Sequence, residues 1–116
     1  MARCVRLSHL HLAFVDFPAA VAWFKTVLRL HPTEESDQAV VFRGTDIEIV
    51  LHPDWGHGDT SATIAFVTDD CARDFAAFVE RGAKARKAPC DKGSSINADV
   101  HGPGRLVVEL EQRTDG

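Results

Sequence analysis

The sequence predicts an α+β domain over residues 1–116, built from two βαβββ modules whose small mixed sheets curve around a shared cavity. Two observations predict this fold. The segment 12–16, Leu-Ala-Phe-Val-Asp, returns 52 positions later as the segment 64–69, Ile-Ala-Phe-Val-Thr-Asp, at the same point of a strand-to-helix unit. The expected strands also alternate apolar and polar residues, which is typical of a sheet with a helix on one face only. An internal repeat is a stronger guide to fold than local propensity.

The first strand is expected over residues 5–15. Because side chains alternate along a strand, His9 and His11 share one face, whereas Leu10, Leu12 and Phe14 share the other. The apolar face requires a covering helix. The two imidazoles point to the opposite surface, where they line a cavity, bind a metal ion or face solvent.

The first helix is expected from Asp16, a good N-cap, to about residue 30. Pro18 suits the first helical turn, where its missing N–H costs nothing. One face carries an apolar stripe at helical spacing, made of Val21, Phe24, Val27 and Leu28.

After a polar connection, two strands complete the first module, which spans about residues 5–54. They are expected at 39–43 and 46–52, with a turn at Gly44. In the second of them Glu48, Val50 and His52 share the face opposite to the apolar one. Residues 55–61 then form a linker that carries Trp55.

The second module is expected over about residues 62–112. A strand at 62–67 leads to a helix that begins after Asp69 or Asp70 and ends at Gly82. We expect this helix to turn Phe75, Phe78 and Val79 inward. Further strands are expected at 84–88, 96–100 and 105–111.

Composition excludes some classes of function. The formal net charge of −4 and the lack of a Lys/Arg cluster argue against nucleic acid as a partner. No apolar run has the length of a signal peptide or a membrane-spanning helix, so no membrane association is expected. Cys4, Cys71 and Cys90 have no metal-ligand spacing and are odd in number, which indicates reduced thiols and a cytoplasmic protein.

From about residue 6 to residue 112 the sequence resembles the vicinal oxygen chelate superfamily, which includes glyoxalase I, bleomycin resistance proteins and extradiol dioxygenases. This resemblance implies the glyoxalase/bleomycin resistance fold, which supports isomerases, transferases, oxygenases and binding proteins alike. The residues that carry it are His9-x6-Asp16, Phe24-x3-Leu28, Ile64-Ala65-Phe66 before Asp69-Asp70, Gly82-Ala83-Lys84, and Gly102-Pro103-Gly104-Arg105 before Val108-Glu109-Leu110.

In the metal-dependent members a divalent ion is bound by one residue from the first strand and one from the last strand of each module. The resemblance places these positions at His9, Glu48, Thr63 and Glu109. Thr63 stands where the family has an imidazole, and a hydroxyl is a poor ligand for zinc, iron or nickel. The expected ligands of one Zn, Fe, Mn or Ni ion are therefore His9, Glu48 and Glu109.

Two of these assignments stay open. A shift of one residue in the alignment of the last strand puts Val108 in place of Glu109, although alternation favours Glu109. The internal repeat sets His11, rather than His9, opposite Thr63. Both histidines are expected to face the same cavity.

Two classes of function follow from the resemblance. The first is a binding protein that sequesters a small organic ligand, aromatic or cationic, with or without a divalent metal ion. The second is a metal-dependent lyase, isomerase or dioxygenase-type enzyme acting on a small oxygenated substrate, with Glu48 or Glu109 as the catalytic proton carrier. The expected ligand-binding residues are His11, His52, Thr63 and Trp55.

A homodimer is also expected. Each module leaves one sheet face uncovered, and a chain of 116 residues buries comparatively little of its own surface. Relatives of this length pair their modules across a two-fold axis. One departure from the family lies at Arg29, where a glycine usually ends the first helix, and it suggests a different exit geometry there.

Overall fold

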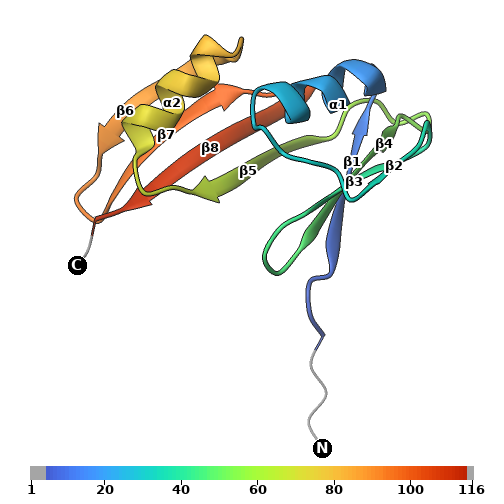
Figure 1. Cartoon of the computed structure of the whole chain (residues 1–116), viewed down its shortest axis with the longest axis horizontal. Helices are drawn as coiled ribbons and strands as arrows, with labels where there is room; N and C mark the ends of the chain where they lie inside the picture. Colours follow the sequence, from blue (N-terminus) through green and yellow to red (C-terminus); the bar gives the residue numbers. More distant parts are fainter. Residues whose placement is uncertain (1–4, 115–116) are drawn as a thin grey trace, which may run out of the picture.

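The structure, a computed structural model, describes residues 5–114 and contains two four-stranded sheets with one helix each (Figure 1). The repeated βαβββ order confirms the predicted fold class. Along the chain the elements are β1 (His9–Phe14), α1 (Phe17–Thr26), β2 (Glu34–Glu35), β3 (Val40–Arg43), β4 (Glu48–Pro53), β5 (Ser61–Val67), α2 (Cys71–Glu80), β6 (Lys84–Asp91), β7 (Ser95–His101) and β8 (Arg105–Arg113).

The two sheets have the same topology. Their strand orders are β1-β4-β3-β2 and β5-β8-β7-β6, with a parallel pair at one edge and antiparallel neighbours after it. In the parallel pairs His9 lies opposite Glu48, and Ala65 lies opposite Glu109. The helix that follows the first strand of each module provides the crossover that a parallel pair requires.

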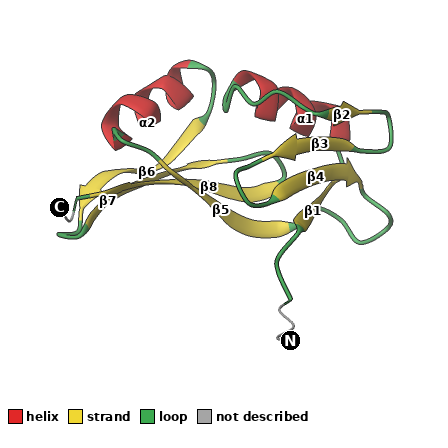
Figure 2. Ribbon diagram, turned by 60° about the horizontal axis from the view of Figure 1, so that its bottom comes forward, coloured by secondary structure: helices red, strands yellow, loops and turns green. Residues whose placement is uncertain are grey.

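Both helices lie on the same side of the two sheets, which stand side by side (Figure 2). The opposite surfaces carry no helix, and we refer to each of them as an open face. Within one chain the two sheets are separate and do not close around a common cavity, so the predicted shared cavity is wrong for the single chain. The open face of the first sheet presents His9, His11, Glu48, Val50 and His52, and that of the second presents Thr63, Ala65, Asn97, Asp99, Val107 and Glu109.

The core lies between the helices and the sheets, as the one-sided apolar strands predict. The Phe24 ring is stacked on the Phe42 ring with centroids 5.5 Å apart, and Phe14 meets Phe24 edge to face. In the second helix Phe78 is buried, but Val79 is 39% exposed, so its predicted inward position is wrong. The reason is spacing, because Cys71, Phe75 and Phe78 already form the inward stripe of α2.

Several element boundaries differ from the prediction. The first strand begins at His9 rather than at residue 5, because its partner β4 begins at Glu48 and leaves the preceding residues without a ladder. The short strand β2 lies in the segment expected to be a polar connection. The strand β6 continues to Asp91, past the expected end at residue 88.

The first helix also ends earlier than predicted, at Thr26. Arg29 has φ of 59°, the left-handed backbone that glycine usually takes at this position. The main-chain N–H of Leu30 donates to the carbonyl of Phe24 at 3.3 Å, which closes the helix end. The expectation of a different exit geometry is therefore wrong, because the arginine adopts the conformation of the glycine it replaces.

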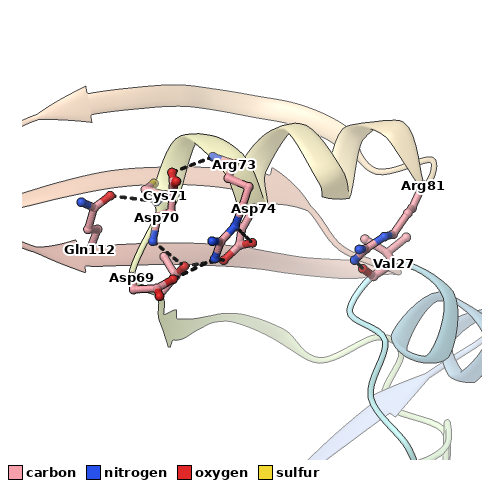
Figure 3. A network of polar contacts seen from close by, with 9 residues as sticks. Val27, Asp69, Asp70, Cys71, Arg73, Asp74, Arg81 and Gln112 are labelled. Atoms are coloured by element: carbon pink, nitrogen blue, oxygen red, sulfur yellow. Dashed lines mark hydrogen bonds and ion pairs between the residues drawn. The ribbon is translucent and has the colours of Figure 1, made fainter.

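The N-terminus of α2 is held by a network of polar contacts (Figure 3). The Asp70 carboxylate caps the helix by accepting from the Arg73 N–H at 3.0 Å, and the Cys71 N–H donates to the Gln112 side chain at 2.8 Å. The hydroxyl of Thr68 donates to Asp74, and this hydrogen bond lowers the pKa of the Asp74 carboxyl, assisted by Arg73. Helix α2 is thereby tied to the strand before it and to β8.

Candidate functional site

The open face of the first sheet carries a row of aromatic rings. The centroids of His9 and His11 are 4.9 Å apart, and those of His11 and His52 are 5.4 Å apart. Trp55 ends the row, with its indole stacked on the His52 ring at 3.8 Å and 10°. Alternation on β1 and β4 sets these side chains on one surface, as the sequence predicts for three of them.

His52 is the most constrained member of this row. It is only 6% exposed, because Trp55 covers it. Its Nδ1 lies 2.8 Å from the carbonyl oxygen of Pro53, which accepts hydrogen bonds but cannot donate them. Neutral His52 therefore carries its proton on Nδ1 and keeps the lone pair on Nε2.

The loop after β4 fixes the position of Trp55. One oxygen of the Asp54 carboxylate accepts the main-chain N–H groups of Gly56, His57 and Gly58, at 2.9, 2.8 and 2.7 Å. The hydrogen bond from Gly58 contributes most to lowering the pKa of the Asp54 carboxyl. Trp55 is held on this turn and remains 66% exposed, so the indole presents free surface to solvent.

Glu48 lies at the other end of the row and is already paired. Both Nε and Nη2 of Arg43 donate to its Oε2, at 3.0 and 2.8 Å. Arg43 and Glu48 are opposite each other in the β3–β4 hairpin, and His9 lies opposite Glu48 on the other side. The imidazole of His9, the carboxylate of Glu48 and the guanidinium of Arg43 thus lie in a row across β1, β4 and β3.

The open face of the second sheet has a different polar arrangement. The Asn97 amide donates to Glu109 at 2.8 Å, and the Ser95 hydroxyl donates to the Asn97 oxygen at 2.6 Å. A hollow of about 240 Å³ lies beside them, where a bulge loosens the pairing of β6 with β7. Bulges of this kind often re-aim side chains near binding sites. Its lining residues include Cys90, Lys92, Asn97, Asp99 and Glu109.

The structure separates the expected metal ligands into two pairs. His9 and Glu48 lie together on the first sheet, whereas Thr63 and Glu109 lie on the second. Glu109 faces the open side and the neighbouring Val108 is fully buried under the helix, as alternation favours. His9 and His11 share the first open face, so the choice between them stays open.

The donor set does not fit a divalent ion in one chain. Among residues 5–114, no three His, Cys, Asp or Glu side chains are gathered closely enough to hold one. Glu48 is bonded to a guanidinium, Glu109 accepts from an amide, and Thr63 offers a hydroxyl. A metal ion at these positions remains a prediction, which requires a second copy to bring the two faces together.

Sequence reasoning missed the groups that hold the two glutamates. One of these groups is Arg43, which pairs with Glu48 across the hairpin. The sequence offered one signal for this pair, because Arg43 and Glu48 are five positions apart on either side of the turn at Gly44. No local pattern predicts that Asn97 reaches Glu109, because that contact depends on the register of β7 against β8.

Two further findings bear on the expected setting of the protein. Cys71 is buried and Cys90 is exposed, both as free thiols, whereas Cys4 lies outside the described residues. Burial raises the pKa of the Cys71 thiol. Neither helix in the described part of the chain is long and apolar enough to cross a membrane. A cytoplasmic location stays a prediction.

Comparison with known proteins places the fold. No family model matches the chain, and no curated protein matches it. Among solved structures, a glyoxalase/bleomycin resistance protein/dioxygenase from Nocardioides superposes with a TM-score of 0.81 at 15% identity, over 100% of this chain and 88% of that one. TnmS3, an antibiotic binding protein from Streptomyces sp. CB03234, superposes with a TM-score of 0.83 at 18% identity, over 98% of this chain and 100% of that one.

A glyoxalase I mutant from Zea mays is similar as well, with a TM-score of 0.77 at 18% identity. The match covers 95% of this chain but only 45% of the maize protein. All three structures have low sequence identity to this chain, so the similarity shows the fold alone. The function has to be inferred from the residues of the open faces.

Proposed function

Because this chain has the glyoxalase/bleomycin resistance fold of the vicinal oxygen chelate superfamily, we propose that it binds a small planar aromatic ligand on its open faces. The observation that carries this proposal is the Trp55 indole. It is stacked on buried His52, fixed by the Asp54 turn, and still 66% exposed. A rigid aromatic surface binds a flat ring with little loss of conformational entropy.

Stacking on Trp55 supplies part of the binding free energy. An aromatic pair contributes about 0.5–1.5 kcal/mol beyond the area that it buries. The exposed imidazole of His11 adjoins this platform, with its ring centroid 5.4 Å from that of the buried His52. TnmS3, which has the same fold, is described as an antibiotic binding protein, and this supports sequestration as the role.

The ligand site is proposed to be completed by a second copy of the chain. The accessible surface area of the chain is 7504 Å², whereas a monomer of this mass is expected to expose ~6200 Å². The difference between these two areas is larger than the ~800 Å² that each partner buries in a stable interface. Exposed apolar side chains of Trp55, stacked on the open-face His52, and of Val67, at the end of β5, lie on the uncovered side of the molecule. A homodimer that brings the first open face of one copy against the second open face of its partner forms two equivalent cavities.

The test is ligand binding with a matched pair of tryptophan variants. Acridine, a planar tricyclic compound, heads a panel of aromatic probes titrated by fluorescence and by isothermal calorimetry. Trp55→Leu is expected to weaken binding at least tenfold. Trp23→Leu, on the helix side, is expected to leave it within twofold. The proposal fails if no probe binds saturably, or if the two variants have equal effects.

A second candidate is a metal-dependent lyase or isomerase of the glyoxalase type. It is supported by the Glu109 carboxylate, which lines the hollow on the second open face and can carry a proton for a substrate bound there. Metal analysis of the purified protein before any chelator treatment, followed by turnover assays with small carbonyl substrates, distinguishes it from simple binding. A stoichiometric metal ion together with turnover would favour the enzyme.

A further inference from the structure

We propose that Arg43 takes the place of a divalent metal ion in this chain, so that the site holds its ligand without metal coordination. The inference rests on the proposed ligand-binding function and concerns how the same site works. The residues at the family's metal positions make contacts here that do not suit a metal ion.

Glu48 is held by a guanidinium from the neighbouring strand. Its Oε2 accepts two hydrogen bonds from the Arg43 guanidinium, over 3.0 and 2.8 Å. Ionised hydrogen bonds of this kind are about twice as strong as neutral ones. Arg43 belongs to the strand next to Glu48 and lies directly opposite it in the ladder, so the guanidinium is supplied by the fold itself. A metal ion would have to compete with this neighbouring cation for the carboxylate, because two positive charges at that distance repel each other.

In the other module, Glu109 Oε2 accepts the Asn97 amide, which is oriented by the Ser95 hydroxyl. This neutral donor orients the Glu109 carboxylate but does not increase its affinity for a metal ion. The remaining position is Thr63, whose hydroxyl replaces an imidazole. Both carboxylates of the expected set are therefore held by side chains of this chain, and the set has lost one of its nitrogen donors.

The consequence concerns the ligand. A metal ion binds its substrate through oxygen or nitrogen atoms that replace water on the ion. An Arg43–Glu48 pair offers hydrogen bonds, and Trp55 offers a stacking surface. The ligand is then an aromatic compound that needs no chelating pair of oxygens.

The test uses Mn²⁺ alone, followed by electron paramagnetic resonance, on four forms of the full chain, with Glu48→Gln as a fifth form that checks any site found in the wild type. Wild type and Thr63→His are expected to have no saturable site below about 100 μM, because Arg43 still holds Glu48. The double variant Arg43→Gln with Thr63→His is expected to bind Mn²⁺ at least tenfold more tightly. The double variant Arg86→Gln with Thr63→His is the matched control, since Arg86 pairs with Asp99 on the second open face, and it should behave like Thr63→His.

Three outcomes overturn the inference. One is a saturable Mn²⁺ site in the wild type that Glu48→Gln weakens at least tenfold. Another is a double variant at Arg43 and Thr63 that binds no better than Thr63→His. The third is loss of acridine binding when a chelator is added. That result would show that the protein does bind the ligand, as proposed, but with the help of a metal ion. If acridine does not bind at all, the proposed function fails, whereas the Mn²⁺ titrations still decide the role of Arg43.

Discussion

The guanidinium of Arg81, directly after α2, donates a hydrogen bond to the main-chain carbonyl oxygen of Val27, directly after α1, over 3.0 Å (Figure 3). The last carbonyls of a helix have no partner inside the helix, and this one is satisfied by a residue 54 positions away in the other module. On the linker side, the Thr60 N–H donates to the carbonyl of Ala13 at 3.0 Å, and the Val15 N–H donates to Asp59 at 2.8 Å. These bonds set the two modules side by side.

Replacing Arg81 tests whether its hydrogen bond to Val27 stabilises the protein. Arg81→Met is expected to lower the free energy of unfolding by about 1 kcal/mol, because the carbonyl of Val27 loses its charged donor. Urea denaturation measures the change. Arg105→Met is the control, because the structure gives Arg105 no side-chain hydrogen bond in the described residues. Equal stability of the two variants would show that the bond contributes nothing.

The left-handed backbone of Arg29 predicts a stabilising substitution. Arg29→Gly is expected to raise the free energy of unfolding by about 0.5–1 kcal/mol, because glycine avoids the clash of Cβ at φ of 59°. Arg29→Ala retains Cβ and should give no gain. Thermal unfolding of the three proteins measures this difference, and a glycine variant that melts no higher than the alanine variant would contradict the expectation.

The turn that holds Trp55 predicts a pH dependence. Main-chain N–H groups, led by that of Gly58, lower the folded-state pKa of Asp54, so its ionised form stabilises the fold. This contribution is complete above the unfolded pKa of about 3.9 and is lost as the pH falls through the lower folded-state pKa. Asp54→Asn should therefore be less stable than the wild type at pH 7, and the difference should shrink towards pH 3.

Urea denaturation at both pH values, followed by tryptophan fluorescence, measures the effect of Asp54→Asn. Asp37→Asn is the control, because this exposed carboxylate makes no hydrogen bond among the described residues. The interpretation fails if Asp54→Asn is as destabilising at pH 3 as it is at pH 7.

The proposed dimer predicts that replacing the exposed Val67 weakens dimerisation, whereas replacing the exposed Val79 does not. Val67, 65% exposed at the end of β5, lies on the uncovered side, whereas Val79, 39% exposed, lies on the outer surface of α2. Sedimentation should find a dimer at micromolar concentration. Val67→Lys is expected to raise the dissociation constant at least tenfold, because association would bury an unpaired ammonium. Val79→Lys should leave it unchanged, and a monomeric wild type would refute the proposal.

Much of the fold follows from short-range patterns. The repeat of segments 12–16 and 64–69 predicts two equivalent modules, and the alternation in β1, β5 and β8 identifies which faces carry helices. These patterns are reliable because the side-chain period of a strand and the spacing of a helical stripe are local properties of the backbone. The cap of the first helix, Asp16, is recognisable for the same reason, whereas the structure was needed to choose Asp70 over Asp69 for the second.

The candidate site was only partly predictable. Alternation places His9, His11 and His52 on one surface, but it does not show that Trp55 covers His52. That contact depends on the turn that Asp54 builds, which is a matter of loop geometry. The pairing of Glu48 with Arg43 likewise depends on the register of a hairpin, and register is decided by the whole sheet.

The sequence by itself determined the two modules, the helix-covered faces and the set of polar residues opposite them, because each depends on neighbours a few positions apart. Only the tertiary structure decided that the two open faces lie side by side rather than facing each other. The bond of Arg81 to Val27 and the contacts of residues 59–60 with β1 impose this arrangement. They join residues more than forty positions apart, and such contacts arise from packing of the complete chain.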